Sequence, residues 1–373
     1  MSTQTTQNTL STLIPAELLQ KSDKILFIAH LALGDFTYLQ NFFRGFAAQH
    51  PHMKIHLWVD EVRRTADASQ WPHLKKYSLY DWTAACPFFA KVYTQTYSPE
   101  LYRASIAEAR REHYPIVVSL ATLRPHLYAG LAREISPEGW VVGMKKSVKL
   151  FQPHHLLAYR KLDAAMPPYH SATPEHHISD VYAHWFRQLS GLEVSGQARF
   201  PFVDIPAQWQ HYAQDQLAAW QFAPRAGKLV FINPYAKTKK RCWPLEHVAA
   251  LIAAMQARDG WQDACFIVNA VPQELANARE VIGRYGLQRT QLFSAEENFF
   301  QLPAMLACCD LIISVETAVM HLANAVQVPV IALMRQKNPE WVPVDRAHST
   351  VITAPGRRDW VKAVSVEQVM KAI

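Results

Sequence analysis

The sequence predicts an α/β protein built from two similar halves. In each half, short apolar runs that suit buried parallel strands alternate with segments whose apolar residues recur at helical spacing. Strands that alternate with helices in this way form βαβ units and parallel sheets. The chain has 373 residues, 50% of them hydrophobic, which is enough for two domains of ordinary size.

The first half shows the alternation from residue 24 onward. Residues 98–100 (Ser-Pro-Glu) predict a helix start, because proline suits the first helical position and an acidic residue suits the first turn. Strands are expected at 24–29, 54–59, 116–120 and 139–144, and helices from residue 35, over 98–113 and over 124–134. Residues 152–202 are rich in proline and histidine, and we expect loops there with one helix at 180–189.

The second half restarts the pattern after a helix at 207–221. Strands are expected at 228–233, 264–268, 291–293, 312–315, 330–333 and 350–353, and helices at 245–257, 272–285, 298–309, 319–326 and 364–373. We therefore predict a loose tail (1–22), an N-terminal domain (23–204), a C-terminal domain (205–355) and a terminal helix segment (356–373).

Composition excludes several classes of protein. Five cysteines without a CxxC pair predict free thiols rather than a zinc site. The five histidines of the histidine-rich region, which are His154, His155, His176, His177 and His184, match no common metal-ligand spacing. No apolar run is long enough to span a membrane, and the polar N-terminus does not resemble a signal peptide.

The formal net charge of +7 favours an anionic partner. The basic residues cluster at loop junctions and do not form a stripe interleaved with aromatic residues, so no specific nucleic-acid binding is expected. A solvated basic surface is the simpler alternative.

Three junctions between a strand and a helix carry polar residues where open parallel sheets bind ligands. At the first, Gly34 permits a tight turn and Asp35 opens the helix, either as a functional carboxylate or as an ordinary helix cap. At the second, Thr238, Lys240 and Arg241 lie on a loop before a helix that Pro244 starts. Hydroxyl, amide and cationic groups there suit a diphosphate, although an exposed basic loop is the alternative.

The third junction is Ser-Val-Glu-Thr-Ala, residues 314–318. Thr317 can cap the helix while free amides remain available to a ligand. Glu316 would repel a phosphate, so a functional Glu316 should turn toward the hydroxyls of a sugar or ribose. His321 lies one turn into the helix. It is either a functional residue or an ordinary packed and hydrogen-bonded histidine.

Together the three junctions resemble glycosyltransferase family 9, the ADP-heptose:lipopolysaccharide heptosyltransferases. The segments that carry the resemblance are KILFIAHLALGD, then Arg241-Cys242-Trp243-Pro244, and then residues 316–325 (ETAVMHLANA), which are similar to the family's Asp-Thr-Gly-x-x-His-Leu-x-x-Ala. The resemblance implies a GT-B fold, with two Rossmann-like parallel-sheet domains facing each other across a cleft. It also implies that the terminal helix crosses back to the first domain.

The resemblance implies an inverting, metal-independent transferase without a cofactor, which moves heptose from ADP-heptose to a lipopolysaccharide core or a related glycan. Asp35 would be the general base and Gly34 would belong to the acceptor loop. Donor binding would involve Thr238, Lys240, Arg241, Glu316, Thr317, Ala318 and His321. The absence of Asp-x-Asp from the chain agrees with a metal-independent class. We expect a cytoplasmic protein with peripheral association at the anionic surface of the inner membrane.

Two residues depart from the family pattern, because Glu316 replaces an aspartate and Ala318 replaces a glycine. Displacing a reacting group by about 1 Å can cost about a hundredfold in rate. Three alternatives therefore stay open: another nucleotide sugar, a protein acceptor, or a catalytically silent paralogue that binds a glycan or a nucleotide.

Overall fold

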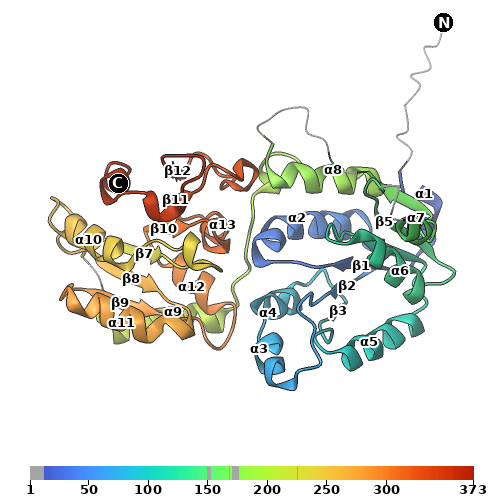
Figure 1. Ribbon diagram of the computed structural model, residues 1–373, viewed down its shortest axis with the longest axis horizontal. Coiled ribbons are helices and arrows are strands. Elements are labelled where there is room, and N and C mark those ends of the chain that lie inside the picture. The colour runs from blue at the N-terminus through green and yellow to red at the C-terminus, as the bar shows by residue number, and fades with distance from the viewer. Residues whose placement is uncertain (1–11, 149–152, 168, 170–175, 225) are drawn as a thin grey trace, which may run out of the picture. The chain divides into compact units, whose positions relative to one another are not determined.

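The computed structural model describes residues 12–148, 153–167, 169, 176–224 and 226–373. The chain divides into two compact units. The first comprises Met1–Ala32, Leu39–Pro174 and Ser179–Ala198, and the second comprises Leu33–Tyr38, Glu175–Ile178 and Arg199–Ile373. Each unit contains one six-stranded parallel sheet with helices between its strands (Figure 1). The predicted fold class, two Rossmann-like parallel-sheet domains, is confirmed.

The first sheet has the strand order β3-β2-β1-β4-β5-β6. Its strands are β1 (Lys24–Ala29), β2 (Lys54–Val59), β3 (Lys91–Tyr93), β4 (Ile116–Ser119), β5 (Trp140–Met144) and β6 (Ala164–Met166). The helices in this part of the chain are α1 (Ala16–Lys21), α2 (Leu33–Gln49), α3 (Trp71–Lys75), α4 (Ser78–Ala85), α5 (Pro99–Arg111), α6 (Pro125–Ile135), α7 (Pro153–Tyr159) and α8 (Ile178–Ser190). As predicted, α5 starts at a Ser-Pro pair, where the Ser98 side chain accepts a hydrogen bond from the Leu101 amide.

The second sheet repeats this arrangement with the order β12-β11-β10-β7-β8-β9. Its strands are β7 (Leu229–Asn233), β8 (Cys265–Asn269), β9 (Thr290–Phe293), β10 (Leu311–Val315), β11 (Val330–Met334) and β12 (Ser349–Thr353). Its helices are α9 (Ala207–Ala219), α10 (Leu245–Gln256), α11 (Leu275–Arg284), α12 (Gln301–Ala307), α13 (Ala318–Ala325) and α14 (Val366–Met370).

Each sheet has a point where the order of its strands reverses. In the first sheet β1 pairs with β2 on one side and β4 on the other, and in the second β7 pairs with β8 and β10. Crevices for ligands form at such points, beyond the carboxyl ends of the strands. All three junctions predicted from the sequence follow β1, β7 or β10, and so lie at these positions.

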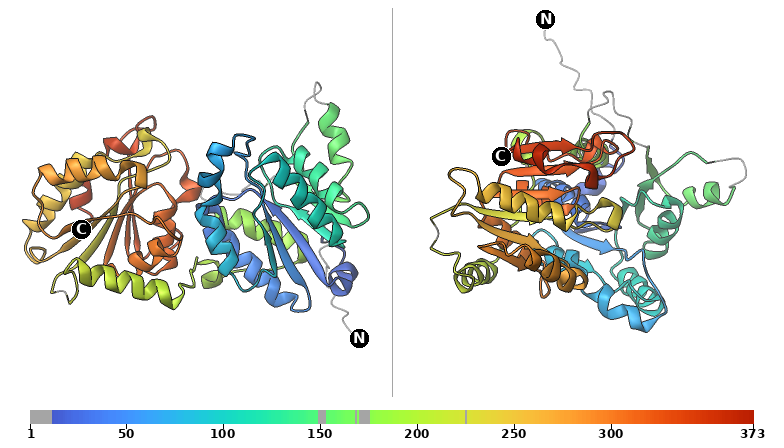
Figure 2. Two further views of the ribbon diagram at one scale, coloured as in Figure 1. Left: turned by 90° about the horizontal axis from the view of Figure 1, so that it is seen from below. Right: turned by 60° about the vertical axis from the view of Figure 1, so that its left-hand side comes forward.

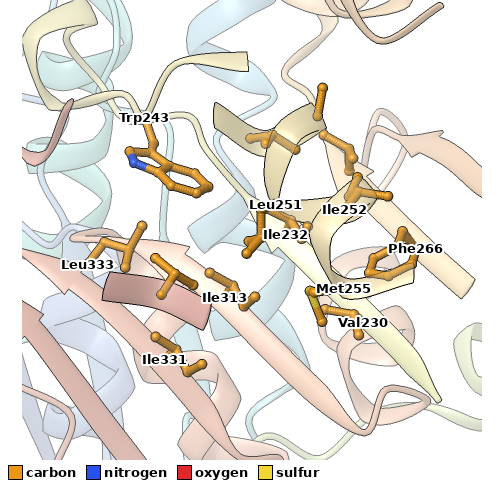
Figure 3. Packing of buried hydrophobic residues seen from close by; sticks show 14 of the residues in the cluster. Val230, Ile232, Trp243, Leu251, Ile252, Met255, Phe266, Ile313, Ile331 and Leu333 are labelled. Carbon is orange, nitrogen blue, oxygen red and sulfur yellow. The ribbon is translucent and has the colours of Figure 1, made fainter. Parts of the chain in front are cut away.

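Helices cover both faces of each sheet (Figure 2). In the second unit, side chains from one face of the sheet pack against α10 and the C-terminal segment. Trp243 lies over the same face as Ile232, Ile313 and Leu333 (Figure 3). Its indole is 2% exposed, and its Nε1 donates to the Val364 carbonyl at 2.9 Å. The tryptophan of the second motif is therefore a core anchor.

The core of the first unit is rich in phenylalanine. Phe27 of β1 makes edge contacts with Phe43 and Phe46 of α2 at 5.1 and 5.5 Å, and a stacked contact with Phe186 of α8 at 5.8 Å. Such aromatic pairs add to the stabilisation from burial. They fix α2 on the sheet, with its first turn just beyond the end of β1.

The prediction of a loose tail over residues 1–22 is wrong for residues 12–22, which are the part of it that the structure describes. The Leu13 and Ile14 amides donate to the Gln188 and Leu189 carbonyls, Ile14 is fully buried, and α1 follows directly. This apolar stretch is ordered because it packs on α8. Residues 1–11 lie outside the described residues. The division between the units falls at residue 198, whereas the sequence predicted 204.

The two outer strands β3 and β6 were not predicted. Each has three residues, too few to show a period-two pattern. Tertiary pairing with β2 and β5 creates them.

The C-terminal helix packs within the second unit, and its crossing to the first domain stays a prediction. Helix α14 packs against α10 within the second unit, and Val361, Val364 and Val369 are buried in that unit's core. The apolar side of the segment thus finds its partner beside Trp243.

Candidate functional site

The loop after β7 carries the cations of the second motif. The Trp243 amide donates to the Pro234 carbonyl at 2.9 Å, which closes the loop, and the Cys242 Sγ accepts from the Ala236 amide at 3.3 Å. A short 3-10 helix, η3 (Lys239–Arg241), forms the end of the loop. The closed loop holds its polar tip outward while Trp243 fixes its base in the core.

Two cations of this loop are positioned by side chains from elsewhere in the second unit. The Arg241 Nη2 lies 3.5 Å from Glu316 Oε1, and its side chain is 32% exposed. The Lys240 Nζ lies 5.8 Å from the ring centroid of Trp360. Thr238 is exposed and precedes η3. Two or more cations beside free amides are a suitable environment for a diphosphate.

An amide network joins the carboxyl ends of β7 and β10. The Asn233 Nδ2 donates to Ser314 Oγ at 3.1 Å and to Thr317 Oγ1 at 3.0 Å. Its Oδ1 accepts from the Asn269 Nδ2 at 2.9 Å. Asn233 was not singled out from the sequence, although a polar residue at the end of an apolar strand was a usable signal.

Thr317 is the N-cap of α13, as predicted. Its hydroxyl accepts from the Val319 amide at 3.4 Å, and α13 begins at Ala318, which is half-buried. The hydroxyl is thus shared between the cap and Asn233, which fixes the start of the helix.

Glu316 is surrounded by protein donors. Its Oε2 accepts from the backbone amide and Nε of Arg335 at 3.3 and 3.2 Å, and its Oε1 accepts from Arg335 Nη2 and Asn338 Nδ2, both at 3.1 Å. Burial by itself raises the pKa of Glu316, but the hydrogen bonds from Arg335 outweigh it and lower the pKa below its usual value. Glu316 is therefore an ionised, buried partner of an arginine that sequence reasoning missed.

His321 is 3% exposed, and its Nδ1 lies 2.8 Å from the Tyr38 hydroxyl. Burial, with a smaller contribution from His177, lowers the pKa of His321 to about 3, so the imidazole is neutral at physiological pH. This environment agrees with the packed, hydrogen-bonded alternative. A direct role in donor binding stays a prediction.

The first junction differs in detail from its prediction. Helix α2 begins at Leu33, so Gly34 lies inside the first turn and not in a tight turn before it. A Cβ added to Gly34 would lie 3.6 Å from the His321 ring, at ordinary contact distance. Asp35 is half-buried in the first turn of α2, where the helix dipole stabilises a carboxylate.

The first unit contains a separate pocket of about 320 Å³ beyond the ends of β2 and β4. Asp60 Oδ1 accepts from Arg64 Nη1 at 3.1 Å, and its Oδ2 accepts from the Tyr128 hydroxyl at 2.6 Å. The Arg64 guanidinium stacks 3.4 Å from the centroid of the Tyr102 ring. Arg124, Val62, Leu123 and Leu127 also line this pocket. It combines cations with an apolar rim, and no motif in the sequence marked it.

In the described part of the chain, no group of three or more His, Cys, Asp or Glu side chains is arranged to hold a metal ion. His154 and His155 instead contact His126, whose ring stacks on His155 at 3.7 Å. All five cysteines are free thiols.

Arg335, Asn338 and Trp360 complete the list of site residues that the sequence did not reveal. Arg335 directly follows β11, at the same edge of the sheet as Glu316. A charged residue directly after an apolar strand was a signal that could have found it. Asn338 and Trp360 lie in loops without such a signal.

Comparison with known proteins identifies a family. The family model described as glycosyltransferase family 9 (heptosyltransferase) matches residues 121–368, more than half of the chain. No curated protein sequence matched significantly.

Solved structures share the fold. A family 9 glycosyl transferase from Veillonella parvula has a TM-score of 0.72 at 18% identity, covering 94% of this chain and 95% of its own. The Escherichia coli ADP-heptose lipopolysaccharide heptosyltransferase II has a TM-score of 0.64 at 15% identity, with 93% and 96% covered. Escherichia coli heptosyltransferase WaaC with ADP has a TM-score of 0.60 at 17% identity, with 94% and 96% covered.

Proposed function

The chain belongs to glycosyltransferase family 9, and from this premise we propose that it transfers heptose from ADP-heptose to a lipopolysaccharide core or a related glycan. The observation that carries the donor assignment is the group formed by Lys240, Arg241 and the N-terminus of α13 at the strand-order reversal of the second sheet. Cations and amides there would stabilise the charge that builds on a departing nucleoside diphosphate.

The proposed reaction inverts the anomeric centre without a metal ion. Asp35 would take the proton from an acceptor hydroxyl as its oxygen attacks the anomeric carbon. The bond from that carbon to the diphosphate breaks, and Thr238, Lys240 and Arg241 would stabilise the leaving oxygen. The name of one structural neighbour, WaaC with ADP, supports the choice of adenine nucleotide.

The acceptor is proposed to bind in the pocket of the first unit. Arg64 and Arg124 would contact anionic groups of a glycan, while Val62, Leu123 and Leu127 would contact apolar parts. The Tyr128 hydroxyl stays protonated, because burial and the Asp60 carboxylate raise its pKa.

Association with an anionic membrane surface is the last part of the proposal. No helix in the described ranges has the length and apolar character needed to cross a bilayer. Leu127 on α6 and Leu156 and Leu157 on α7 are 50–61% exposed. The stacked rings of His126 and His155 show that the two helices are neighbours. Lys161 and Leu127 line a common hollow. Exposed leucines near cations suit the interface of an anionic bilayer.

The donor assignment is tested by calorimetric titration with ADP, UDP, GDP and CMP, first without and then with Mg²⁺. We expect selective binding of ADP that does not need the metal. Preference for another nucleotide would show that the donor is a different nucleotide sugar. This is the leading alternative, because Glu316 stands where the family has an aspartate. Absence of binding to all four would favour the silent paralogue.

The catalytic role is tested by Asp35→Asn. We expect turnover to fall by about 10²–10⁴-fold, the usual contribution of a general base, while ADP affinity and the circular dichroism spectrum stay unchanged. Turnover close to that of the wild type would exclude Asp35 as the base.

A further inference from the structure

Glu316 has its hydrogen-bonding capacity filled by the protein. A carboxylate offers about four lone-pair positions, and Glu316 accepts three hydrogen bonds from Arg335 and one from Asn338. Its side chain is 7% exposed. A sugar hydroxyl could therefore reach this carboxylate only by displacing one of these protein donors.

Arg335 is equally enclosed. Its side chain is 9% exposed, and its guanidinium lies 5.2 Å from the ring centroid of Trp360. A buried ion pair contributes little net stability, because desolvation of both charges offsets their attraction. A contribution to folding stability therefore does not by itself explain why this ion pair is present.

The pair stands beside the partly exposed cations of the η3 loop. Arg241 approaches the same Glu316 oxygen that binds Arg335 and Asn338, and Lys240 approaches the same Trp360 ring that Arg335 contacts. The negative charge of Glu316 neutralises the positive charge of Arg335. The positive charges of Lys240 and Arg241 therefore remain available to an anionic ligand.

We propose that Glu316 and Arg335 form a positioning pair that orients Arg241 toward the leaving diphosphate, and that Glu316 does not contact the donor sugar. The longer glutamate reaches Arg335 at the end of the neighbouring strand β11, which gives a physical reason for the departure from aspartate. This inference rests on the proposed function, because it requires a nucleoside diphosphate at this site.

The test compares ligands that do and do not carry the sugar. Dissociation constants for ADP, ADP-heptose and inorganic pyrophosphate are measured by calorimetry on the wild type, Glu316→Gln and Arg335→Lys. We expect both variants to bind all three ligands about tenfold more weakly, the effect of a misplaced charge-assisted hydrogen bond, with an unchanged ratio of ADP to ADP-heptose affinity. If Glu316→Gln weakens ADP-heptose alone, the carboxylate holds the sugar and the proposal is wrong.

Two further variants keep the test decisive. Glu246→Gln removes an exposed carboxylate on α10 and should leave all three affinities unchanged. Glu316→Gln/Arg335→Met removes both buried charges, so it leaves no buried, unpaired arginine that could prevent folding. A folded double variant that binds pyrophosphate as tightly as the wild type would overturn the proposal.

Failure of the proposed donor can be told apart from failure of the pair. If the wild type binds pyrophosphate but neither ADP nor ADP-heptose, the donor is wrong, and weaker pyrophosphate binding by Glu316→Gln still supports the pair. If the wild type binds none of the three, the cation group is not a diphosphate site and the inference falls.

Discussion

At the scale of single residues, the environment of a side chain decides its role more than its identity does. Glu316 occupies the position at which the family motif has an aspartate, yet Arg335 and Asn338 bind it from the loop that follows β11. Trp243 belongs to the second motif, yet it is buried in the core. The sequence motifs give the positions of both residues. Their surroundings in the structure decide whether each side chain faces a ligand or other protein groups.

His321 should make stability depend on pH. Its pKa is lowered from 6.5 to about 3 in the folded protein, so the unfolded state binds more protons between these values. Stability due to the neutral imidazole is present above pH 6.5 and is lost as the pH falls toward 3. Between pH 7 and 5 we expect the free energy of unfolding to fall by about 2 kcal/mol from this group.

The comparison protein for this measurement is His321→Gln, which keeps polar atoms and does not titrate. Thermal melting of both proteins from pH 7 to 5 isolates His321, because the other histidines contribute equally to each. Equal losses of stability in the two proteins would show that His321 is not buried neutral in solution.

At the scale of elements, the loop between β7 and α10 combines two tasks. Its tip presents Lys240 and Arg241, and its base places Trp243 on the sheet and on the C-terminal segment through the Val364 carbonyl. A loop anchored at its base can hold charged groups in place, which preorganised electrostatic stabilisation requires.

We therefore expect Trp243→Phe to lower stability by about 1–3 kcal/mol, because the buried Val364 carbonyl loses its donor. Hydrogen exchange should increase in η6 (Val361–Ala363) and α14. Thermal melting and exchange mass spectrometry measure these effects. Trp209 of α9 is only half-buried, so Trp209→Phe is the matched control and should change stability less. Unchanged exchange at residues 361–370 would show that Trp243 does not anchor the segment.

At the scale of the whole molecule, the same strand order occurs in both sheets although the two halves differ in sequence. The order follows from right-handed βαβ crossovers that start in the middle of a sheet and return there after three strands. This topology brings the ends of β7 and β10 together, and with them Asn233 and Thr317, which lie 84 positions apart.

The exposed leucines of α6 and α7 predict membrane binding. Leu156→Ser/Leu157→Ser should weaken the affinity for phosphatidylglycerol vesicles, measured by co-sedimentation, by about a hundredfold or more, since the two leucines together contribute about 3–6 kcal/mol when buried. Val271→Ser, at an exposed apolar residue of the second unit, is the control and should have no effect. Equal binding by the double variant would place any membrane contact elsewhere.

The sequence by itself determined the fold class, most of the strands and helices and the three junctions. These features depend on local periodicity, caps and strand-to-helix turns, which a single segment displays. The pattern also predicted Thr317 as the cap of α13 and a helix beginning at Pro244, which is the N-cap residue directly before α10.

Only the tertiary structure decided which side chains meet. Arg335 binds Glu316 across neighbouring strands, Asp60 binds Tyr128 across 68 positions, and β3 and β6 exist only as partners of longer strands. The packing of α14 on α10 belongs to the same group. Such contacts depend on strand order and on the geometry of packed side chains, so no local stretch of sequence encodes them.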